Sequence, residues 1–382
     1  PDEPDGPKWP TSTNYDKTVN ETVSYVDQNG HVVAKQHTDS VNFTRTVVVD
    51  NVTGEVITSG AGTTAWTAKN GDTTFDAVVS PVVSGSVANK AQTATVTDLN
   101  ADSANVTETV TYTKVGSLVP SSSDGNFPRV PTVVYPNDPS DATKVTPAGV
   151  PTVSGYTAHN PEGHVLKPGS SYQPSDPTKD TTITYTADTQ KVTVTYVVEG
   201  TGTVLHTDNL EGKSGETIGY STVAKLAELK ALGYDLVTDG FTTATDKNFD
   251  KDTKVDQSFV VTVKPHVEPI KPVDPENPND PNKPKPGDPI DPNNPDGPKW
   301  TEDLIKQIDT TRHVNRTITS VNEKGEEVAQ KVTDKVTFTR EGKINSVTGE
   351  ITYGNWTAKD GDTTFDKVES PVVQGYILKD AK

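Results

Sequence analysis

This 382-residue sequence contains one candidate metal-binding run, in which side chains with oxygen atoms occupy alternate positions. The run has the pattern D-x-N-x-D-x-D. The pattern resembles the start of a calcium-binding loop, in which alternating oxygen ligands surround a hard cation. It then departs from that loop, because Lys251 replaces the turn glycine and Gln257 stands where a bidentate glutamate is needed. We interpret the run as a solvated acidic hairpin, so no cofactor is expected, with calcium as the alternative. The candidate ligands are Asp246, Asn248, Asp250 and Asp252.

Other groupings that could carry chemistry are weaker. Gly212, Lys213 and Ser214 look like the end of a phosphate-binding loop, but Thr207 stands where that loop needs its first glycine. Seven histidines are scattered without a spacing that suits zinc on one element, and the chain has no cysteine. A glycosidase would need two carboxylates fixed in a cleft, which thin domains do not offer. We therefore expect no catalytic residues and no enzyme.

Two tryptophans are candidates for binding sugar rings, because an exposed indole face can stack on a carbohydrate. Trp66 and Trp356 sit in nearly identical neighbourhoods. This sameness favours a structural anchor, and the sugar platform stays as the alternative. They are the only ligand-contact candidates that the residues suggest.

These tryptophans begin a block that occurs twice. The twenty residues 66–85 return at 356–375 with sixteen identities. Ala77 and Val79 become Lys367 and Glu369, whereas the valine between them is kept. Because successive side chains of a strand point to opposite faces, the varied positions face solvent and the kept valine faces a core. The chain is therefore part of a repeat array whose copies share a core.

Composition sets further bounds on the fold and on the partners. Only 31% of the residues are hydrophobic, which predicts several small domains and not one large core. A net charge of −18 opposes nucleic acid as a partner. No apolar stretch approaches the ~20 residues of a membrane span, and no signal segment leads the chain. We expect the sequence to begin inside the array, because its start resembles residues 292–300.

The elements that must position these residues are mainly strands, since Thr and Val alternate along much of the chain. Residues 221–232 break this rhythm with helix formers, and Gly233 provides a stop. Two strands before this helix and two after it give the order ββαββ, which is a β-grasp topology with one helix on a small mixed sheet. We predict these strands at about 191–198, 203–210, 234–239 and 255–263.

Proline-rich and irregular segments separate the predicted domains. Residues 265–299 carry a proline at nearly every third position, which predicts a polyproline II tether that forms neither ladder nor helix. The second copy lacks an equivalent of strand 106–112, so we expect its sheet to miss a partner. The expected order is a linker end at 1–13, a large β-rich domain at 14–115, an irregular extension with short strands at 116–189, a β-grasp domain at 190–264, the tether at 265–299, and a second large domain at 300–382.

Three strings identify a resemblance to a known family. FTRTVVVDNVTGEV, YPNDPSDATKVTP and KVTVTYVVEGTGTVLHTDNLEGKSGETIGYS are similar to the mucus-binding (Mub) repeats of lactobacillal cell-surface adhesins. The resemblance implies a ubiquitin-like β-grasp domain paired with a larger β-rich domain. It also implies export, anchoring to the cell wall, and binding of mucin glycans and, in some members, immunoglobulins. The family has no catalytic residues to carry over.

The expected protein is thus mostly β with one α+β domain, an elongated array of beads on a string. We expect a monomeric adhesin segment on the outside of a bacterial cell, whose weak contacts to mucin glycoproteins add up through effective concentration. The alternative is a structural stalk that spaces other modules and has no ligand of its own.

Overall fold

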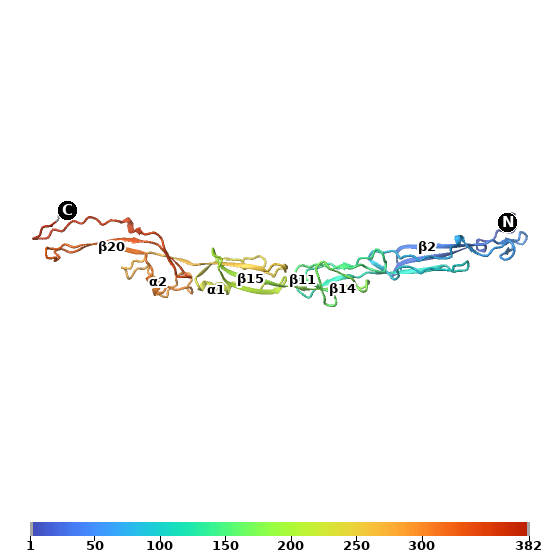
Figure 1. The fold of residues 1–382 in the computed structure, drawn as a ribbon, viewed down its shortest axis with the longest axis horizontal. Helices are drawn as coiled ribbons and strands as arrows, with labels where there is room; N and C mark the ends of the chain where they lie inside the picture. The colour runs from blue at the N-terminus through green and yellow to red at the C-terminus, as the bar shows by residue number, and fades with distance from the viewer. Residues whose placement is uncertain (1–2, 380–382) are drawn as a thin grey trace. The chain divides into compact units, whose positions relative to one another are not determined.

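The computed structural model describes residues 3–379, so the first two and last three residues of the expected ranges lie outside the described part. The chain divides into two compact units, residues 1–188 and 189–382, each built mainly of strands (Figure 1). The mostly β architecture predicted from the Thr and Val alternation is confirmed. None of the helices among the described residues is long and apolar enough to cross a membrane.

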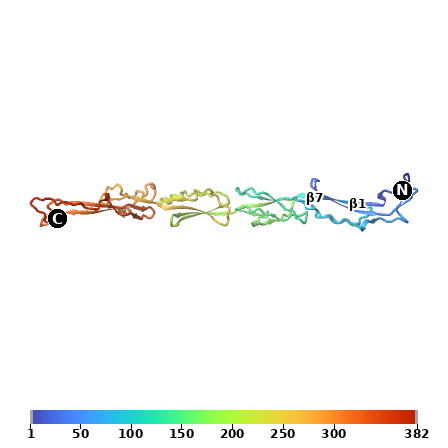
Figure 2. The same ribbon diagram turned by 90° about the horizontal axis from the view of Figure 1, so that it is seen from above.

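The first sheet of unit 1 has two long strands at its centre. Strand β1 alternates buried and half-buried or exposed side chains, with Val19, Val23 and Tyr25 on the core face. It pairs with β2 in an antiparallel hairpin and with β7 in parallel (Figure 2). The sheet order is β5-β2-β1-β7-β6, formed by Thr67–Ala68, Val32–Thr44, Asp16–Asp27, Val106–Lys114 and Ser86–Ala88. A small hairpin, Val48–Val49 with Val56–Ile57, and two short helical turns, Ser12–Asn14 and Lys69–Gly71, complete this domain.

The segment expected to be irregular, residues 116–189, has a sheet and core of its own. Its fully buried side chains include Leu118, Tyr135 and Ile183. The Tyr135 hydroxyl donates to the carbonyl of Lys179 at 2.8 Å, which ties two loops together. The sheet order is β12-β11-β14-β8-β9, formed by Val165–Leu166, Tyr156–His159, Thr181–Ala187, Ser117–Ser121 and Val133–Val134. A two-stranded ribbon pairs β10, Ala148–Gly149, with β13, Ser171–Tyr172.

Unit 2 begins with the predicted β-grasp domain. Helix α1, Val223–Ala231, buries Leu229 in the core of the sheet and ends before Gly233, whose φ of +104° suits glycine. The Thr222 side chain does not cap the helix; it donates to Asp239 at 2.6 Å. The sheet order is β16-β15-β18-β17, formed by Val204–Lys213, Thr189–Val198, Gln257–Pro265 and Tyr234–Asp239.

One strand connectivity recurs in three of these sheets. In each, the first strand of the domain makes an antiparallel hairpin and also pairs in parallel with a strand from the end of the same domain. That late strand pairs on its other side with a third, antiparallel strand. The central parallel pairs are β1 with β7, β8 with β14, and β15 with β18. The order expected for the β-grasp domain alone is thus shared by its two predecessors, which lack the helix.

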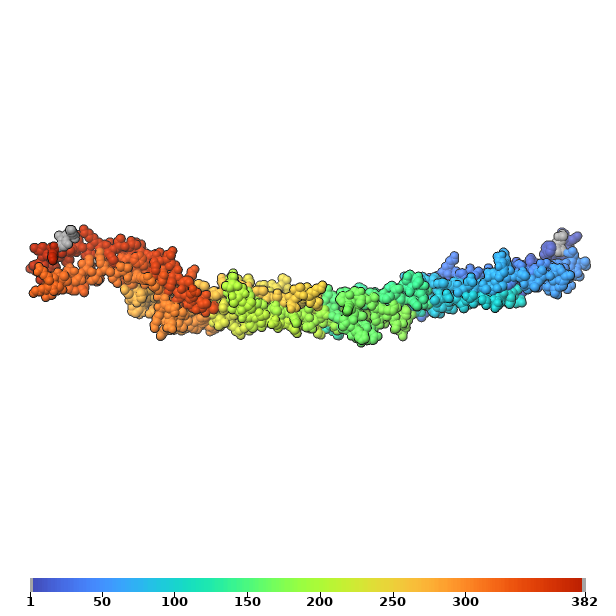
Figure 3. All heavy atoms as spheres, in the orientation of Figure 1, coloured from blue at the N-terminus to red at the C-terminus, as the bar shows by residue number. Residues whose placement is uncertain are grey.

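The proline-rich segment differs from the expected tether. Residues Val267–Ile270 form β19, which pairs with β22, Gly342–Asn345, at the edge of a three-stranded sheet completed by β23, Ile351–Tyr353. An edge strand tolerates Pro269 because its missing N–H is not needed by a second neighbour. Ile290 and Trp300 are buried against Ile344. Figure 3 shows the orange atoms of this segment lying against the rest of unit 2.

The second large domain repeats the plan of the first. Helix α2, Glu302–Lys306, has Thr301 as its cap, which accepts from the Leu304 amide. The sheet order is β20-β21-β24, formed by Thr311–Ile318, Val332–Thr339 and Thr357–Ala358, followed by the turn Lys359–Gly361. Among the described residues, no strand pairs with the outer side of β20 as β7 pairs with β1 in the first copy.

Candidate functional site

Trp66 stands directly before β5, where that strand pairs with β2 beside Phe43. Its half-buried ring packs against the core of the first domain. The guanidinium of Arg45 lies 4.4 Å from the ring centroid, and the Lys17 ammonium lies 5.3 Å from it. Cations over an indole face are attracted by the ring quadrupole. We call Trp66, Arg45 and Lys17 the Trp66 cluster.

The second copy repeats this arrangement. Trp356 stands before β24, and the guanidinium groups of Arg340 and Arg312 lie 4.4 Å and 4.6 Å from its ring centroid. Arg340 also lies 3.8 Å from the ring of Tyr353. We call Trp356, Arg340 and Arg312 the Trp356 cluster. Both candidate tryptophans are half-buried, and cations lie over both rings.

One residue makes the two clusters differ in charge. In the second copy Asp309 accepts from Arg312 at 2.7 Å and from Arg340 at 3.2 Å. The hydrogen bond from Arg312 lowers the pKa of Asp309 below its usual value, so this carboxylate stays ionised. Arg340 also donates to the backbone carbonyl of Asp309 at 2.7 Å, and at the same place in the first copy Arg45 donates to the backbone carbonyl of Asn14 at 2.6 Å. Only the carboxylate is missing in the first copy.

The Trp66 cluster consequently keeps more of its positive charge. Asn14 is neutral, and Lys17 reaches the exposed Asp102 at 3.4 Å, a contact that water screens strongly. A guanidinium and an ammonium beside an apolar indole can bind a carboxylate or a sulfate ester on a sugar ring.

The candidate calcium ligands lie in a loop, where two of their side chains accept hydrogen bonds from backbone amides of turns. Asp246 and Asp252 accept from the backbone amides of Asn248 and Lys254, each at 2.9 Å. The backbone carbonyl of Asp250 accepts from the Gln190 side chain at 3.0 Å. Among the described residues, these aspartates do not belong to any group of three acidic or histidine side chains whose ligand atoms lie within 4.8 Å of one another.

Gly212, the first residue of the triplet that resembles a phosphate-binding loop, is explained by packing against a core side chain. A Cβ at Gly212 would lie 2.2 Å from an atom of the Phe249 ring. The glycine therefore makes room for a core aromatic of the β-grasp domain.

The structure brings three histidines together with carboxylates, which the sequence reasoning missed because it considered histidines along one element. The groups are Glu21 with His37 and Asp39; Asp235 with His266 and Asp291; and Asp274 with Glu276 and His313. The signal available in the sequence was the spacing of two between His37 and Asp39, which places both side chains on one face of a strand.

Two hollows lie in unit 2. One is an apolar recess of about 300 Å³ between α1 and β17, lined by Leu226, Leu229 and Val263 among others. The larger, of about 1130 Å³, lies between the turn after β20 and residues 370–379. In the first domain β7 occupies the equivalent side of β1, so this second hollow marks an unpaired strand edge.

Comparison with known proteins matches three stretches of the chain to two domain families. Residues 10–116 and 305–382 match a Muc B2-like domain, and residues 190–265 match a mucin binding domain. No curated protein matches the chain.

Solved structures similar to this chain include Mub-RV, with 27% identity, a TM-score of 0.37, and coverage of 50% of this chain and 86% of that one. The type 2 repeat of the mucus binding protein MUB from Lactobacillus reuteri has 29% identity, a TM-score of 0.30, and coverage of 50% and 87%. A MucBP domain of an adhesion protein from Pediococcus pentosaceus has 33% identity and a TM-score of 0.21, with coverage of 25% and 97%.

Proposed function

Because this chain belongs to the family of mucus-binding (Mub/MucBP) repeats, we propose that it is a segment of a bacterial cell-surface adhesin that binds the glycans of host mucin glycoproteins. The match of residues 190–265 to a mucin binding domain carries this proposal. The description of that domain names mucin binding. The segment would be displayed outside the cell, anchored to the wall by parts of the protein beyond this chain.

We further propose that acidic mucin sugars bind at the Trp66 cluster. The whole chain is acidic, so long-range attraction to an anionic glycan has the wrong sign. Contact must therefore depend on a local group of cations with an apolar surface beside it. Arg45, Lys17 and Trp66 supply these within about 5 Å of one ring. Asn14 is neutral, so the group has no equivalent of the Asp309 carboxylate that pairs with both arginines of the Trp356 cluster.

Each contact would be weak, and the repeated domains would add their contributions. A second site tethered to the first rebinds at a high effective concentration, so an array binds far more tightly than one module. Immunoglobulins are the second class of partner that the family implies. The mucin-binding test below should therefore include an immunoglobulin as a separate ligand. A stalk without a ligand is the competing function.

The test measures binding of the chain to immobilised mucin before and after enzymatic removal of sialic acid and sulfate. We expect Arg45→Ala to weaken binding about tenfold, as for a lost charge-assisted contact of about 1.4 kcal/mol. Arg340→Ala is the matched control, because Asp309 already pairs with both arginines of the Trp356 cluster. Equal binding by wild type and Arg45→Ala would rule out the Trp66 cluster as the binding site. If the chain bound no mucin at all, a structural stalk without a ligand would be favoured.

A further inference from the structure

Glu21 is a carboxylate in an apolar stripe. It lies on the core face of β1 between Val19 and Val23, and only 1% of the residue is exposed. Its Oε1 atom is buried and has no hydrogen-bond partner among the described residues. An ionised carboxylate in such a place is costly unless a cation or donors meet it. This position therefore calls for a positive partner.

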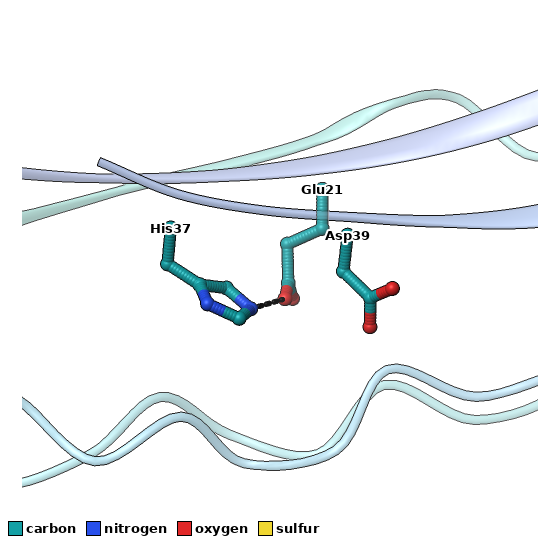
Figure 4. Close-up of side chains that lie close together, drawn as sticks. All are labelled: Glu21, His37 and Asp39. Carbon is teal, nitrogen blue, oxygen red and sulfur yellow. Dashed lines mark ion pairs between the residues drawn. The ribbon is translucent and has the colours of Figure 1, made fainter. Parts of the chain in front are cut away.

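The neighbouring strand offers ligands and no fixed cation. Asp39 lies directly opposite Glu21 in the antiparallel pair, and His37 lies opposite Val23, so all three polar side chains share one face. Figure 4 shows the carboxylate of Glu21 between the His37 ring and Asp39. The Nε2 atom of His37 is 3.8 Å from Oε1 of Glu21, and one ligand atom from each of the three lies within 4.8 Å of the others.

The electrostatics agree with this geometry. Burial raises the pKa of Glu21, His37 acts to lower it, and the charges of Asp39 and Glu108 raise it further. Two carboxylates facing each other across a strand pair repel, and like charges in that position destabilise a sheet. Glu108 itself pairs with Lys90 at 3.2 Å, so its charge is met elsewhere.

The second large domain shows how the same place is neutralised by a side chain. The strand registers align Glu21 with Arg316 and Asp39 with Asp334. Arg316 donates to Asp334 at 3.1 Å and to the carbonyl of Asp366 at 2.6 Å. The residue equivalent to His37 is Val332. The second copy thus has the cation of Arg316 and no histidine at this place. The first copy has a histidine, His37, and two carboxylates, and it has no arginine there.

We propose that Glu21, His37 and Asp39 bind a divalent first-row transition cation, of which zinc is the representative, at the place where Arg316 stands in the second copy. One imidazole nitrogen with two carboxylate oxygens suits zinc, whereas calcium and magnesium prefer oxygen alone. Ligands of one zinc ion lie about 3 to 4 Å apart, so the exposed Asp39 must move slightly inward. Water completes the coordination from the solvent side.

The other two histidine groups do not call for a metal. His266 makes contacts of 2.8 Å with Asp235 and 2.5 Å with Glu268. His313 makes contacts of 2.8 Å with Thr337 and with Asp274. Both rings therefore already have partners on each nitrogen.

The test is a calorimetric titration of the full chain with zinc chloride after removal of metals by a chelator and dialysis. We expect wild type to bind one equivalent that His37→Ala loses or binds at least tenfold more weakly. His164→Ala is the matched control, because that exposed histidine belongs to none of the three groups, and it should keep the equivalent. Calcium and magnesium should not replace zinc.

Glu21→Arg keeps the test decisive if a variant folds poorly. This change recreates the pair that Arg316 makes with Asp334, so we expect the zinc equivalent to disappear while the metal-free melting temperature stays at or above that of wild type. Zinc should raise the melting temperature of wild type and leave that of Glu21→Arg unchanged. The proposal is overturned if wild type binds no zinc, or if both variants bind the same number of equivalents with unchanged affinity.

Discussion

The side-chain amide of Asn294 donates a hydrogen bond of 2.8 Å to the backbone carbonyl of Lys230, in the last turn of helix α1. This contact joins the proline-rich segment to the β-grasp domain across 64 residues of sequence. The Lys230 carbonyl also accepts from the Gly233 amide at 3.0 Å, so Asn294 adds a second donor at the end of the helix from a distant part of the chain. Beside it, the Ser346 amide donates to the carbonyl of His266 at 2.8 Å.

Asn294→Ala should destabilise unit 2 by about 0.5 to 1.5 kcal/mol, because the hydrogen bond to the Lys230 carbonyl is lost. The residue is 7% exposed, so water replaces the amide poorly. Urea denaturation of the chain measures the effect. Asn293→Ala, at an exposed neighbour, should change the midpoint little. Equal midpoints for the two variants would contradict a structural role for this contact.

The stability of unit 2 should fall as pH rises through neutrality. Burial acts to lower the pKa of His266, but hydrogen bonds to Glu268 and Asp235 and the charges of Asp235 and Asp291 raise it above its usual value. A raised pKa means that the protonated ring favours the fold. Its contribution is full below the unfolded pKa of about 6.5 and is lost as pH passes the folded value.

We therefore expect the melting temperature of unit 2 to decline as pH rises above about 6.5. His266→Gln should remove most of that slope, and His164→Gln should keep it. An unchanged slope in His266→Gln would show that another group carries the dependence.

Asn14→Asp should weaken binding to acidic mucin about two- to fivefold, which corresponds to an exposed ion pair of up to about 1 kcal/mol. The change gives the Trp66 cluster the carboxylate that Asp309 supplies to the Trp356 cluster. Far-UV circular dichroism should stay as in wild type, because the same arrangement folds in the second copy. Asn14→Ser, which adds no charge, is the control, and equal loss in both would argue against electrostatics.

Gly116→Ala should destabilise the domain of residues 116–189 by about 1 to 3 kcal/mol, because a methyl group there overpacks. A Cβ at this position would lie 2.4 Å from the backbone carbonyl of Lys179. Gly125→Ala meets nothing within 4 Å and should shift stability by less than about 0.5 kcal/mol. Limited proteolysis or urea denaturation compares the two. Similar stability would mean that the close approach of these loops is absent in solution.

Calcium at millimolar concentration should leave the melting temperature unchanged. Asp246 and Asp252 already accept turn amides, and the aspartates of this loop are in none of the described groups of clustered ligand atoms. A rise that Asp250→Asn abolishes would restore this loop as a calcium site.

The sequence predicted some parts of this protein well because their signals are local. Alternating burial along β1 and the helix between Ser221 and Gly233 follow from side-chain spacing within a few residues. The ββαββ order then leaves few arrangements for a small sheet, and the β-grasp domain is confirmed. The resemblance to mucus-binding repeats is confirmed over the two large domains and the β-grasp domain.

Other parts depended on pairings that no local pattern announces. Strand β8 pairs with β14 about 63 residues later, and most strands of that domain span only two to five residues. Pro269 discouraged a ladder, yet at a sheet edge its missing N–H is harmless. Trp9 is 68% exposed and Trp300 is 7% exposed, because Ile270 and Ile290 cover only the second.

By itself, the sequence excluded thiol chemistry, because the chain has no cysteine. Residue type and spacing also predicted which faces of the strands are buried, where the helix lies and which family the chain belongs to. Only the tertiary structure decided which side chains from separate strands lie next to each other. Glu21 meets His37 and Asp39 where Arg316 meets Asp334, and Arg45 meets Asn14 where Arg340 meets Asp309. Charge balance at a point depends on side chains from separate strands, so it is fixed by register and packing and not by composition.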